Sequence, residues 1–431
     1  MGPGGSGGRG SCLDADLTGL CHTGLFPRGI LPLVSGLRLA EQARADALER
    51  EPCRFSARVS ILKIRSIHPH GRPGAMPFRD APLFSECFMN LRRMPAEWEP
   101  HAATWLAWPH NREDWPGKFL TIPWVYAEII RHLSRHEPVE ILVQDASAET
   151  KARHLLERAG ALGANVRFHH CPTDRIWMRD SGCSFVQEDG VLKAVTWRFT
   201  AWAKYNNWQR DEVVGSLMAS LARAEELRPQ VGPGRVVLEG GSIDVNGCGT
   251  LLTTEECLLS SVQQRNPGLG KADYERIFAE YLGIRQVLWL ERGIEGDDTH
   301  GHVDDITRFV APGIIVTAVE PNAADPNHAP LAENLRRLRA AQDLEGRPFR
   351  IVELPMPSPV HFEGRRLPAS YVNFYIANGL VLVPVFNDPK DRLALNILAE
   401  LFPDREVVGI YSGDFIWGFG AMHCMTQQQP A

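Results

Sequence analysis

Five side chains with catalytic potential stand at nearly regular intervals in the sequence. They are Asp180, Glu239, His302, Asp304 and Cys424. The first two are 59 residues apart, His302 follows after 63 residues, and Cys424 after a further 122, about twice that interval. Repeats of constant length place equivalent positions at the same end of a common axis. The spacing therefore predicts that the five side chains converge on one site.

This combination of a thiol, an imidazole and carboxylates suits nucleophilic attack on the carbon of a guanidinium group. That carbon is a poor electrophile, because resonance spreads the positive charge over three nitrogens. Asp180 and Asp304 are predicted to fix the guanidinium plane by accepting its N–H groups in paired hydrogen bonds. Cys424, as a thiolate, is the predicted nucleophile. His302 is predicted to protonate departing ammonia and then to activate water, oriented by Glu239 or by its acidic neighbours.

Each of these residues has a simpler interpretation when it is considered alone. Asp180 follows Arg179, which is typical of a surface ion pair or a helix cap, and Glu239 precedes two glycines, as at many strand ends. His300 and His302 have the spacing of a divalent metal site, but no further cluster of ligands lies near them in the sequence. The joint occurrence of the residues favours the guanidinium site, and the sequence predicts no metal.

The elements that must position these residues follow a repeating pattern of strand, strand, helix and strand. Four turns typical of β-hairpins mark the repeats: Asp189-Gly190, Asn246-Gly247, Pro312-Gly313 and Asn378-Gly379. Helical patterns follow at residues 211–223, 271–281, 330–342 and 388–401, and apolar strands then at 235–238, 285–290, 349–354 and 406–411. An earlier copy has strands at 105–108 and 139–143 around a helix at 124–135, then an extra helix at 149–160 and a strand at 165–169. About five α/β units in one chain predict a closed radial arrangement, because an open one would leave sheet edges exposed.

Composition and charge narrow the class of protein. Hydrophobic residues make up 44% and charged residues 23% of the 431, and no apolar run is long enough to cross a bilayer. Nine cysteines without a CxxC pair argue against a disulfide framework and favour a reducing cytoplasm. Residues 94–431 carry 33 basic against 44 acidic side chains, which argues against a nucleic acid partner and is compatible with a small cationic substrate.

Residues 1–93 differ from the rest. They begin with a glycine-rich tract, carry 13 basic against 8 acidic side chains and show one short helical pattern at 37–51. We expect a poorly ordered extension, and Met94 is a candidate for the biological start. An organellar transit peptide fits less well, because such peptides carry few acidic residues.

The segment from Gly418 to Pro430 surrounds the predicted nucleophile with glycines, which let the backbone approach a ligand closely. A terminus is usually frayed. Here the position of Cys424 in the repeat predicts instead that the last residues are ordered and buried at the centre of the ring. Trp98 and Trp177 are candidate substrate contacts, since an indole facing a cation stabilises it.

Several motifs in order resemble the agmatine deiminase and bacterial peptidylarginine deiminase family, over residues 94–431. They are Met94-Pro95-Ala96-Glu97-Trp98, Trp177-Met178-Arg179-Asp180, Glu239-Gly240-Gly241-Ser242, Asp298-Thr299-His300-Gly301-His302-Val303-Asp304, Tyr371-Val372-Asn373 and His423-Cys424-Met425-Thr426. The resemblance implies a five-bladed α/β propeller of the pentein type. It also implies hydrolysis of a guanidine to a urea and ammonia through a covalent cysteine adduct, without a metal or organic cofactor.

Carried over by motif, Cys424 resembles the nucleophile, His302 the acid and base, Asp180 and Asp304 the guanidinium clamp, Glu239 its acidic partner and Asp298 a substrate contact. Agmatine, giving N-carbamoylputrescine in polyamine biosynthesis, is the expected substrate. Departures at Thr200, Ala203, Phe419 and Met422 leave peptidyl-arginine or another guanidine open. An amidinotransferase and a guanidine-binding sensor are further alternatives, and the sequence does not decide whether the chain forms a homo-oligomer.

Overall fold

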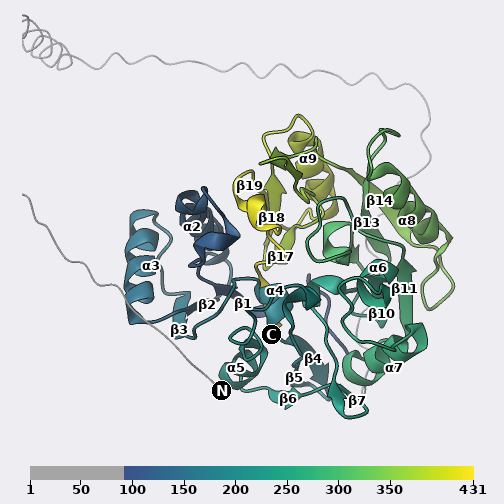
Figure 1. Cartoon of the computed structure of the whole chain (residues 1–431), viewed down its shortest axis with the longest axis horizontal. Coiled ribbons are helices and arrows are strands. Elements are labelled where there is room, and N and C mark those ends of the chain that lie inside the picture. The colour runs from purple at the N-terminus through teal and green to yellow at the C-terminus, as the bar shows by residue number, and fades with distance from the viewer. Residues whose placement is uncertain (1–91) are drawn as a thin grey trace, which may run out of the picture. The chain divides into compact units, whose positions relative to one another are not determined.

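Three-stranded sheets recur along the chain in the computed structural model, which describes residues 92–431 (Figure 1). In each sheet a hairpin supplies an antiparallel pair, and a helical crossover then adds a parallel third strand. Four sheets have this form: β4 (Ser184–Glu188), β5 (Val191–Val195) and β6 (Glu225–Leu227); β9 (Asp244–Val245), β10 (Thr250–Thr254) and β11 (Gln286–Leu290); β12 (Thr307–Ala311), β13 (Ile314–Val319) and β14 (Arg350–Pro355); β17 (Tyr375–Ala377), β18 (Leu380–Val385) and β19 (Glu406–Tyr411). The described chain is therefore mixed α/β, as predicted.

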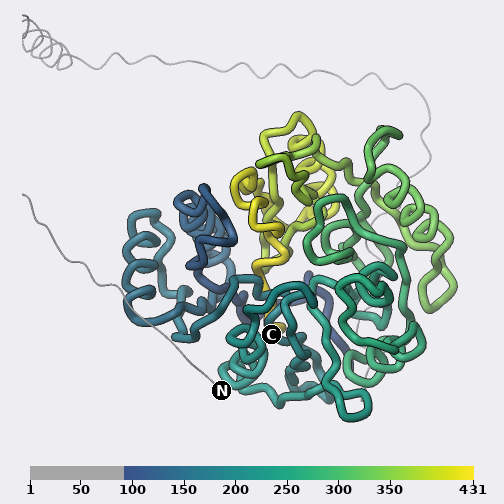
Figure 2. Tube along the Cα trace, in the orientation of Figure 1, coloured from purple at the N-terminus to yellow at the C-terminus, as the bar shows by residue number. Residues whose placement is uncertain are grey.

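A fifth sheet combines the two ends of the described chain. Its order is β20 (Gln427–Pro430), β1 (His101–Ala107), β2 (Val139–Val143) and β3 (Val166–His170), and β20 runs antiparallel to β1. In Figure 2 the C-terminus is marked near the middle of the coloured segments, where β20 pairs with β1. The last residues are thus ordered in a strand and mostly buried, as predicted, and their place at the centre of a ring stays a prediction.

Helices connect the parallel strands and cover the sheets. The longer ones are α2 (Ile122–Leu133), α3 (Ala146–Arg158), α5 (Val214–Leu221), α7 (Lys271–Leu282), α8 (His328–Ala340) and α9 (Asp391–Leu401). Short elements are α4 (Met178–Ser181), α6 (Glu255–Leu259), the ribbons β7 (Gln230–Val231) with β8 (Gly234–Arg235) and β15 (His361–Phe362) with β16 (Arg365–Arg366), and 3₁₀ turns that include η3 (Ala201–Ala203), η4 (Gly240–Ser242), η5 (Val303–Asp305) and η6 (Phe415–Gly418). Each of the longer helices buries an apolar face; in α2 this face includes Ile129, Ile130 and Leu133. Every helix between residues 92 and 431 is too short or too polar to cross a membrane.

The predicted hairpins and helices agree with the structure within a few residues, but one strand is wrong. The sequence places a strand at residues 235–238, whereas the parallel partner of β5 is β6, at Glu225–Leu227. Val236 and Leu238 are buried in a core cluster. Strand β8 ends at Arg235, and among the described residues the only β-pairing of residues 236–238 is an isolated bridge between Val237 and Arg198. The apolar run therefore fills the core without continuing a sheet.

The start of the described chain is anchored to strand β4 and to the end of helix α7. The backbone N–H of Arg93 donates to the carbonyl of Gln187 at 2.9 Å, and that of Met94 to Leu282 at 3.0 Å. The predicted helix at 37–51 and the expected extension, apart from Arg92 and Arg93, lie outside the described residues.

Candidate active site

The predicted catalytic residues follow the last strand of one sheet and precede the hairpin of the next. Asp180 lies on α4, Glu239 immediately precedes η4, His302 precedes η5 and Asp304 lies within it. Cys424 stands between η6 and β20. Short turns at these points direct side chains inward, so the regular spacing in the sequence becomes proximity in the fold.

His302 lies at the centre of the group. Its Nδ1 is 3.8 Å from Oδ1 of Asp180 and 4.0 Å from Oδ1 of Asp304, and its Nε2 is 3.5 Å from Oε2 of Glu239. Neither ring nitrogen has a hydrogen-bond partner among residues 92–431, and the side chain is buried. Burial alone would lower the pKa of His302, but Asp180, Cys257 and Glu239 outweigh it and raise the pKa well above its usual value.

Gly241 permits this close packing. A Cβ at this position would lie 2.5 Å from Nδ1 of His302 and 2.9 Å from Oδ1 of Asp180. Its backbone N–H donates to Asp180 Oδ1 at 3.1 Å, and Trp202 Nε1 donates to Oδ2 at 2.9 Å. Burial nevertheless raises the pKa of Asp180 to about 6, with the charges of Asp304 and Glu239 adding to the effect.

The thiol of Cys424 faces the same carboxylates. Asn373 Nδ2 donates to its Sγ at 3.1 Å, and Asp304 Oδ2 is 3.7 Å from Sγ. Burial raises the pKa of the thiol well above its usual value, and Asp304, Asp305 and Asp180 raise it further. Without a cation beside it, the nucleophile is therefore held as a thiol.

A cavity of about 630 Å³ reaches this group from outside. Its walls include Asn111, Glu113, Asp114, Arg175, Trp177, Asp180, Trp202, Tyr205, Asp298, Arg365, Phe419, Gly420 and Cys424. Gly420 allows Trp177 to approach the nucleophile, since a Cβ there would lie 2.5 Å from the indole and 3.0 Å from Cβ of Cys424. An elongated guanidine can therefore reach Cys424 between aromatic walls.

The remaining predicted contacts divide into two groups. Trp177 and Asp298 line the cavity, whereas Trp98 packs against the core cluster that contains strands β13 and β18 and is absent from the cavity wall. Phe419 lines the cavity, but Met422 is fully buried in another core cluster and does not. The structure therefore places Trp177, Asp298 and Phe419 at the cavity wall, and Trp98 and Met422 outside it.

Asp298 is already paired inside the protein. Its Oδ1 is 2.5 Å from Nζ of Lys204, and its Oδ2 accepts from the hydroxyl of Tyr205 at 2.6 Å. Nearby, Arg175 pairs with Asp114 at 2.7 Å and lies 4.2 Å over the ring of Tyr205. Both acidic side chains therefore have a cationic partner at the cavity wall.

Trp202 is held by an unusual turn. Residues Ala201, Trp202 and Ala203 have φ angles of 46°, 58° and 52°, in the left-handed region that favours glycine. Ala203 is one of the departures from the family noted above. The turn keeps the indole N–H on Asp180, so the departure leaves that contact in place.

Sequence reasoning missed a buried network behind Asp304. His423 Nδ1 lies 2.6 Å from Oδ2 of Asp304, and its Nε2 lies 2.8 Å from Oε2 of Glu97. Glu97 in turn pairs with Arg179 at 3.1 Å and Arg308 at 2.9 Å. Burial would raise the pKa of Glu97, but Arg308, His423 and Arg179 hold it well below its usual value. Glu97 and His423 both lie in motifs quoted above, and these motifs are the feature of the sequence that marks the two residues.

The whole described chain matches a known family. The model of the Porphyromonas-type peptidyl-arginine deiminase family matches residues 93–430. The chain belongs to this family. The predicted resemblance is thereby confirmed.

Individual relatives of the chain support the same assignment. The chain is 37% identical over 362 residues to the agmatine deiminase of Stutzerimonas stutzeri, covering 78% of this chain and 95% of the relative. The agmatine deiminase of Pseudomonas aeruginosa (strain LESB58) is 37% identical over 79% of this chain and 95% of its own length. Among solved structures, the agmatine deiminase of Enterococcus faecalis has a TM-score of 0.72 at 31% identity, over 79% of this chain and 96% of that one. The fold is thus that of the agmatine deiminases.

Proposed function

We propose that the protein hydrolyses the guanidine group of agmatine to a urea, giving N-carbamoylputrescine and ammonia. The observation that carries the proposal is the meeting of Cys424, His302 and the carboxylates of Asp180, Glu239 and Asp304 at the end of one cavity. Membership of a deiminase family and the agmatine deiminases among its relatives support this substrate.

The guanidinium plane binds between Asp180 and Asp304. Within the described residues, Oδ1 of Asp304 is buried without a hydrogen-bond partner, so it can accept an N–H of the substrate. Trp177 and Phe419 line the path of the alkyl chain. The substrate cation offsets the negative field of the carboxylates, which lowers the pKa of Cys424 and generates the thiolate where it is used.

The thiolate of Cys424 attacks the guanidinium carbon, and the C–N bond to one terminal nitrogen breaks. His302, whose pKa is raised, protonates that nitrogen, which departs as ammonia. The neutral imidazole then takes a proton from water, whose oxygen attacks the amidino carbon and displaces Cys424. Glu239 stays ionised, because Arg265 Nε lies 3.2 Å from Oε2, and it stabilises the imidazolium.

A second substrate class is favoured by the cavity wall. Asp298 is paired with Lys204, and Asp114 with Arg175, so neither carboxylate offers its full charge to the ammonium of agmatine. A guanidine whose tail lacks an ammonium, such as a peptidyl-arginine, would not need that charge. The named family is that of a peptidyl-arginine deiminase, which agrees with this alternative.

The two substrates are separated by measuring ammonia release from agmatine, arginine, peptidyl-arginine and a neutral-tailed alkylguanidine. Agmatine is expected to have the highest kcat/KM, and Cys424→Ala to abolish release from every compound. Wild-type release by Cys424→Ala would contradict the mechanism. Glycine in a parallel reaction tests an amidinotransferase, which would break the C–N bond to the alkylamine and yield guanidinoacetate and putrescine in place of the urea and ammonia.

Two structural proposals accompany the function. We propose that the five sheets form the blades of a closed propeller, with β20 completing the first sheet; the pairing of β20 with β1 supports this. We also propose that residues 94–431 constitute the deiminase domain, since the family match spans 93–430.

A further inference from the structure

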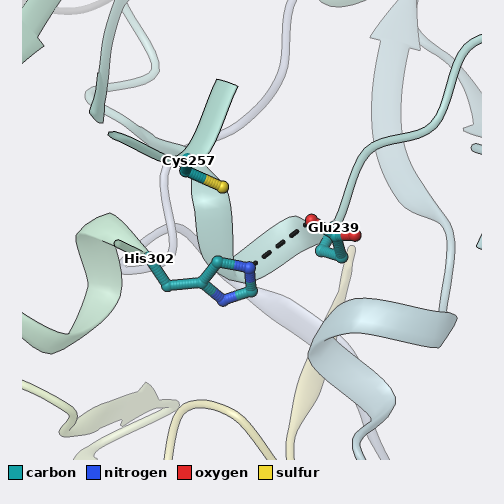
Figure 3. A group of neighbouring side chains, drawn as sticks. All are labelled: Glu239, Cys257 and His302. Carbon is teal, nitrogen blue, oxygen red and sulfur yellow. Dashed lines mark ion pairs between the residues drawn. The ribbon is translucent and has the colours of Figure 1, made fainter. Parts of the chain in front are cut away.

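A second cysteine lies beside the imidazole of His302. Cys257 belongs to α6, and its backbone N–H donates to Oγ1 of Thr254 at 3.0 Å, which caps the helix and fixes the direction of its side chain. Figure 3 shows the sulfur of Cys257 and the carboxylate of Glu239 directed toward the imidazole of His302. The proposed hydrolysis uses His302 and Glu239, but it assigns no step to this thiol.

Glu239, Cys257 and His302, here called the rear cluster, have the composition of a metal site. One ligand atom from each lies within 4.8 Å of those of the other two, and all three side chains are buried. A thiolate, an imidazole and a carboxylate are ligands that Zn²⁺ accepts in tetrahedral sites, with a fourth position left for water. Independently, both nitrogens of His302 are buried without a hydrogen-bond partner in the part of the chain that the structure describes. No hydrogen bond of Nε2 therefore has to break for it to bind a metal, and Glu239, its ion-pair partner at 3.5 Å, is itself a ligand of the cluster.

We propose that the rear cluster binds a thiophilic divalent cation, best Zn²⁺, and that the bound ion reversibly inhibits the enzyme. Nε2 of His302, Oε2 of Glu239 and Sγ of Cys257 are the protein ligands. Binding converts the thiol of Cys257 to a thiolate and releases its proton to water. The inhibitory consequence rests on the proposed guanidine hydrolysis, whereas the binding does not.

Inhibition follows from the role of His302. A nitrogen that donates its lone pair to the metal cannot carry a proton, and the charge of the ion prevents the ring from becoming an imidazolium. Ammonia then departs without an acid, and the adduct on Cys424 is hydrolysed without a base. Removing a general acid or base costs on the order of 10² to 10⁴ in rate.

Arg265 limits the affinity of the cluster. Its Nε lies 3.3 Å from Oε1 and 3.2 Å from Oε2 of Glu239, so a positive charge already faces one ligand. A carboxylate has about four acceptor positions on its two oxygens, so Glu239 has capacity for both the guanidinium and the metal. The repulsion makes the ion exchangeable, as an inhibitor must be, and unlike a permanent structural zinc.

A rival group uses the nucleophile. Asp304, Asp305 and Cys424 also have ligand atoms within 4.8 Å of one another. Asn373, however, donates to Oδ1 of Asp305 at 2.9 Å and to Sγ of Cys424 at 3.1 Å. Oδ2 of Asp304 is taken by His423. A metal there would break these contacts, whereas the nitrogens of His302 have no hydrogen bond within the described residues to lose.

The binding test uses Co²⁺ as a spectroscopic substitute for Zn²⁺ in the full chain. A thiolate bound to Co²⁺ gives a near-ultraviolet charge-transfer band. The proposal expects this band in the wild type and in Cys424→Ser, and its loss in Cys257→Ser. Cys183→Ser is the matched control, because Cys183 is buried elsewhere, and it should keep the band. Absence of the band in the wild type, or its loss in Cys424→Ser alone, overturns the proposal.

Inhibition by Zn²⁺ is then measured against each variant's own rate without metal. The inhibition constant should rise at least tenfold in Cys257→Ser, since even the loss of a metal ligand's supporting partner costs about 10- to 100-fold in affinity. An unchanged constant overturns the proposal. If Cys257→Ser does not fold, X-ray absorption of Zn²⁺ on Cys424→Ser must show one sulfur at about 2.3 Å; a shell of nitrogen and oxygen alone rejects the site. A cobalt band in a protein that releases no ammonia would contradict the proposed hydrolysis and leave the metal site standing.

Discussion

Nδ1 of His423, the residue before the nucleophile Cys424, lies 2.6 Å from Oδ2 of Asp304. Its other nitrogen is 2.8 Å from Glu97, which is itself held by two arginines. Burial would raise the pKa of Asp304, but the hydrogen bond and charge of His423 lower it. His423 therefore positions the carboxylate that faces the substrate and keeps it ionised.

Replacing His423 with glutamine should weaken substrate binding. Loss of a charge-assisted hydrogen bond to Asp304 is expected to raise KM by about 10- to 100-fold. Because a depressed carboxyl pKa preserves ionisation to low pH, its rise in the variant should move the acidic limb of the kcat/KM profile to higher pH. Steady-state kinetics across pH measures both effects.

His101→Gln provides the matched control. His101 is buried and lies 3.1 Å from Glu137, but it does not line the cavity. It should lower the melting temperature without moving the acidic limb. Equal shifts of that limb in both variants would show that His423 has only a structural role.

The raised pKa of Cys424 predicts a preference for cationic alkylating reagents. Chloroacetamidine brings a positive charge to Asp180 and Asp304, whereas chloroacetamide does not. Each unit by which the cation lowers the thiol pKa increases the thiolate fraction about tenfold at neutral pH. Cys424 should therefore be alkylated at least tenfold faster by the amidine, as followed by peptide mass spectrometry.

Cys248 in the same sample serves as the internal control, because it is half-buried and outside the cavity wall. It should react with the two reagents at similar rates. The preference at Cys424 should also shrink as pH rises toward the pKa of the free thiol. Equal rates at Cys424 at neutral pH would mean that the carboxylates do not control the nucleophile.

Lys204→Gln should improve the use of agmatine. Removing the cation 2.5 Å from Asp298 frees its carboxylate for the ammonium of the substrate. A partly exposed ion pair is worth up to about 1 kcal/mol, so KM should fall by roughly fivefold. Lys271→Gln removes a comparable exposed pair with Glu255 and should leave KM unchanged. A fall in KM for a neutral alkylguanidine as well would refute the assignment of Asp298 to the tail.

Removal of Gln427–Ala431 should impair the site from a distance. This deletion eliminates β20 and with it Gln428, whose Oε1 accepts from Nη1 of Arg179 at 2.6 Å. The backbone N–H of Arg179 in turn donates to the carbonyl of Cys424 at 3.2 Å. A lower melting temperature and at least a tenfold loss of kcat/KM are expected, taking the loss of a hydrogen bond to a charged group as about 1.5 kcal/mol or more. Deleting Ala431 alone is the control; equal activity of the two truncations would be inconsistent with the role of β20.

Repeats and hairpins were predictable because their signals are local. Asn246-Gly247 and its counterparts specify turns, and the apolar periodicity of α7 and α9 specifies helices. β6 was not predictable, since Glu225–Leu227 is short and polar and becomes a strand only by pairing with β5. The apolar residues 235–238 have the pattern of a strand, because burial in the core and burial in a sheet look alike in sequence.

The same distinction holds for the site. Asp180, Glu239, His302, Asp304 and Cys424 recur with the repeat, so their convergence followed from spacing. Cys257 reaches the site only across the fold, and no local pattern in the sequence marks it. Asn373 lies in one of the quoted motifs, but that motif does not predict its hydrogen bond to Cys424. Trp98 lies in a family motif but faces a core cluster, which shows that a motif locates a segment and does not orient each side chain.

The most direct test of the account is the mass of the intact protein after a reaction with agmatine is quenched with acid. A covalent adduct on Cys424, with the mass of agmatine less ammonia, should be trapped in the wild type during turnover, and it should form more slowly in His302→Gln, because the departing ammonia is no longer protonated. Peptide mapping should place it on Cys424, and Cys424→Ala should carry none. An adduct on another residue, or ureido product released by Cys424→Ala, would contradict the mechanism.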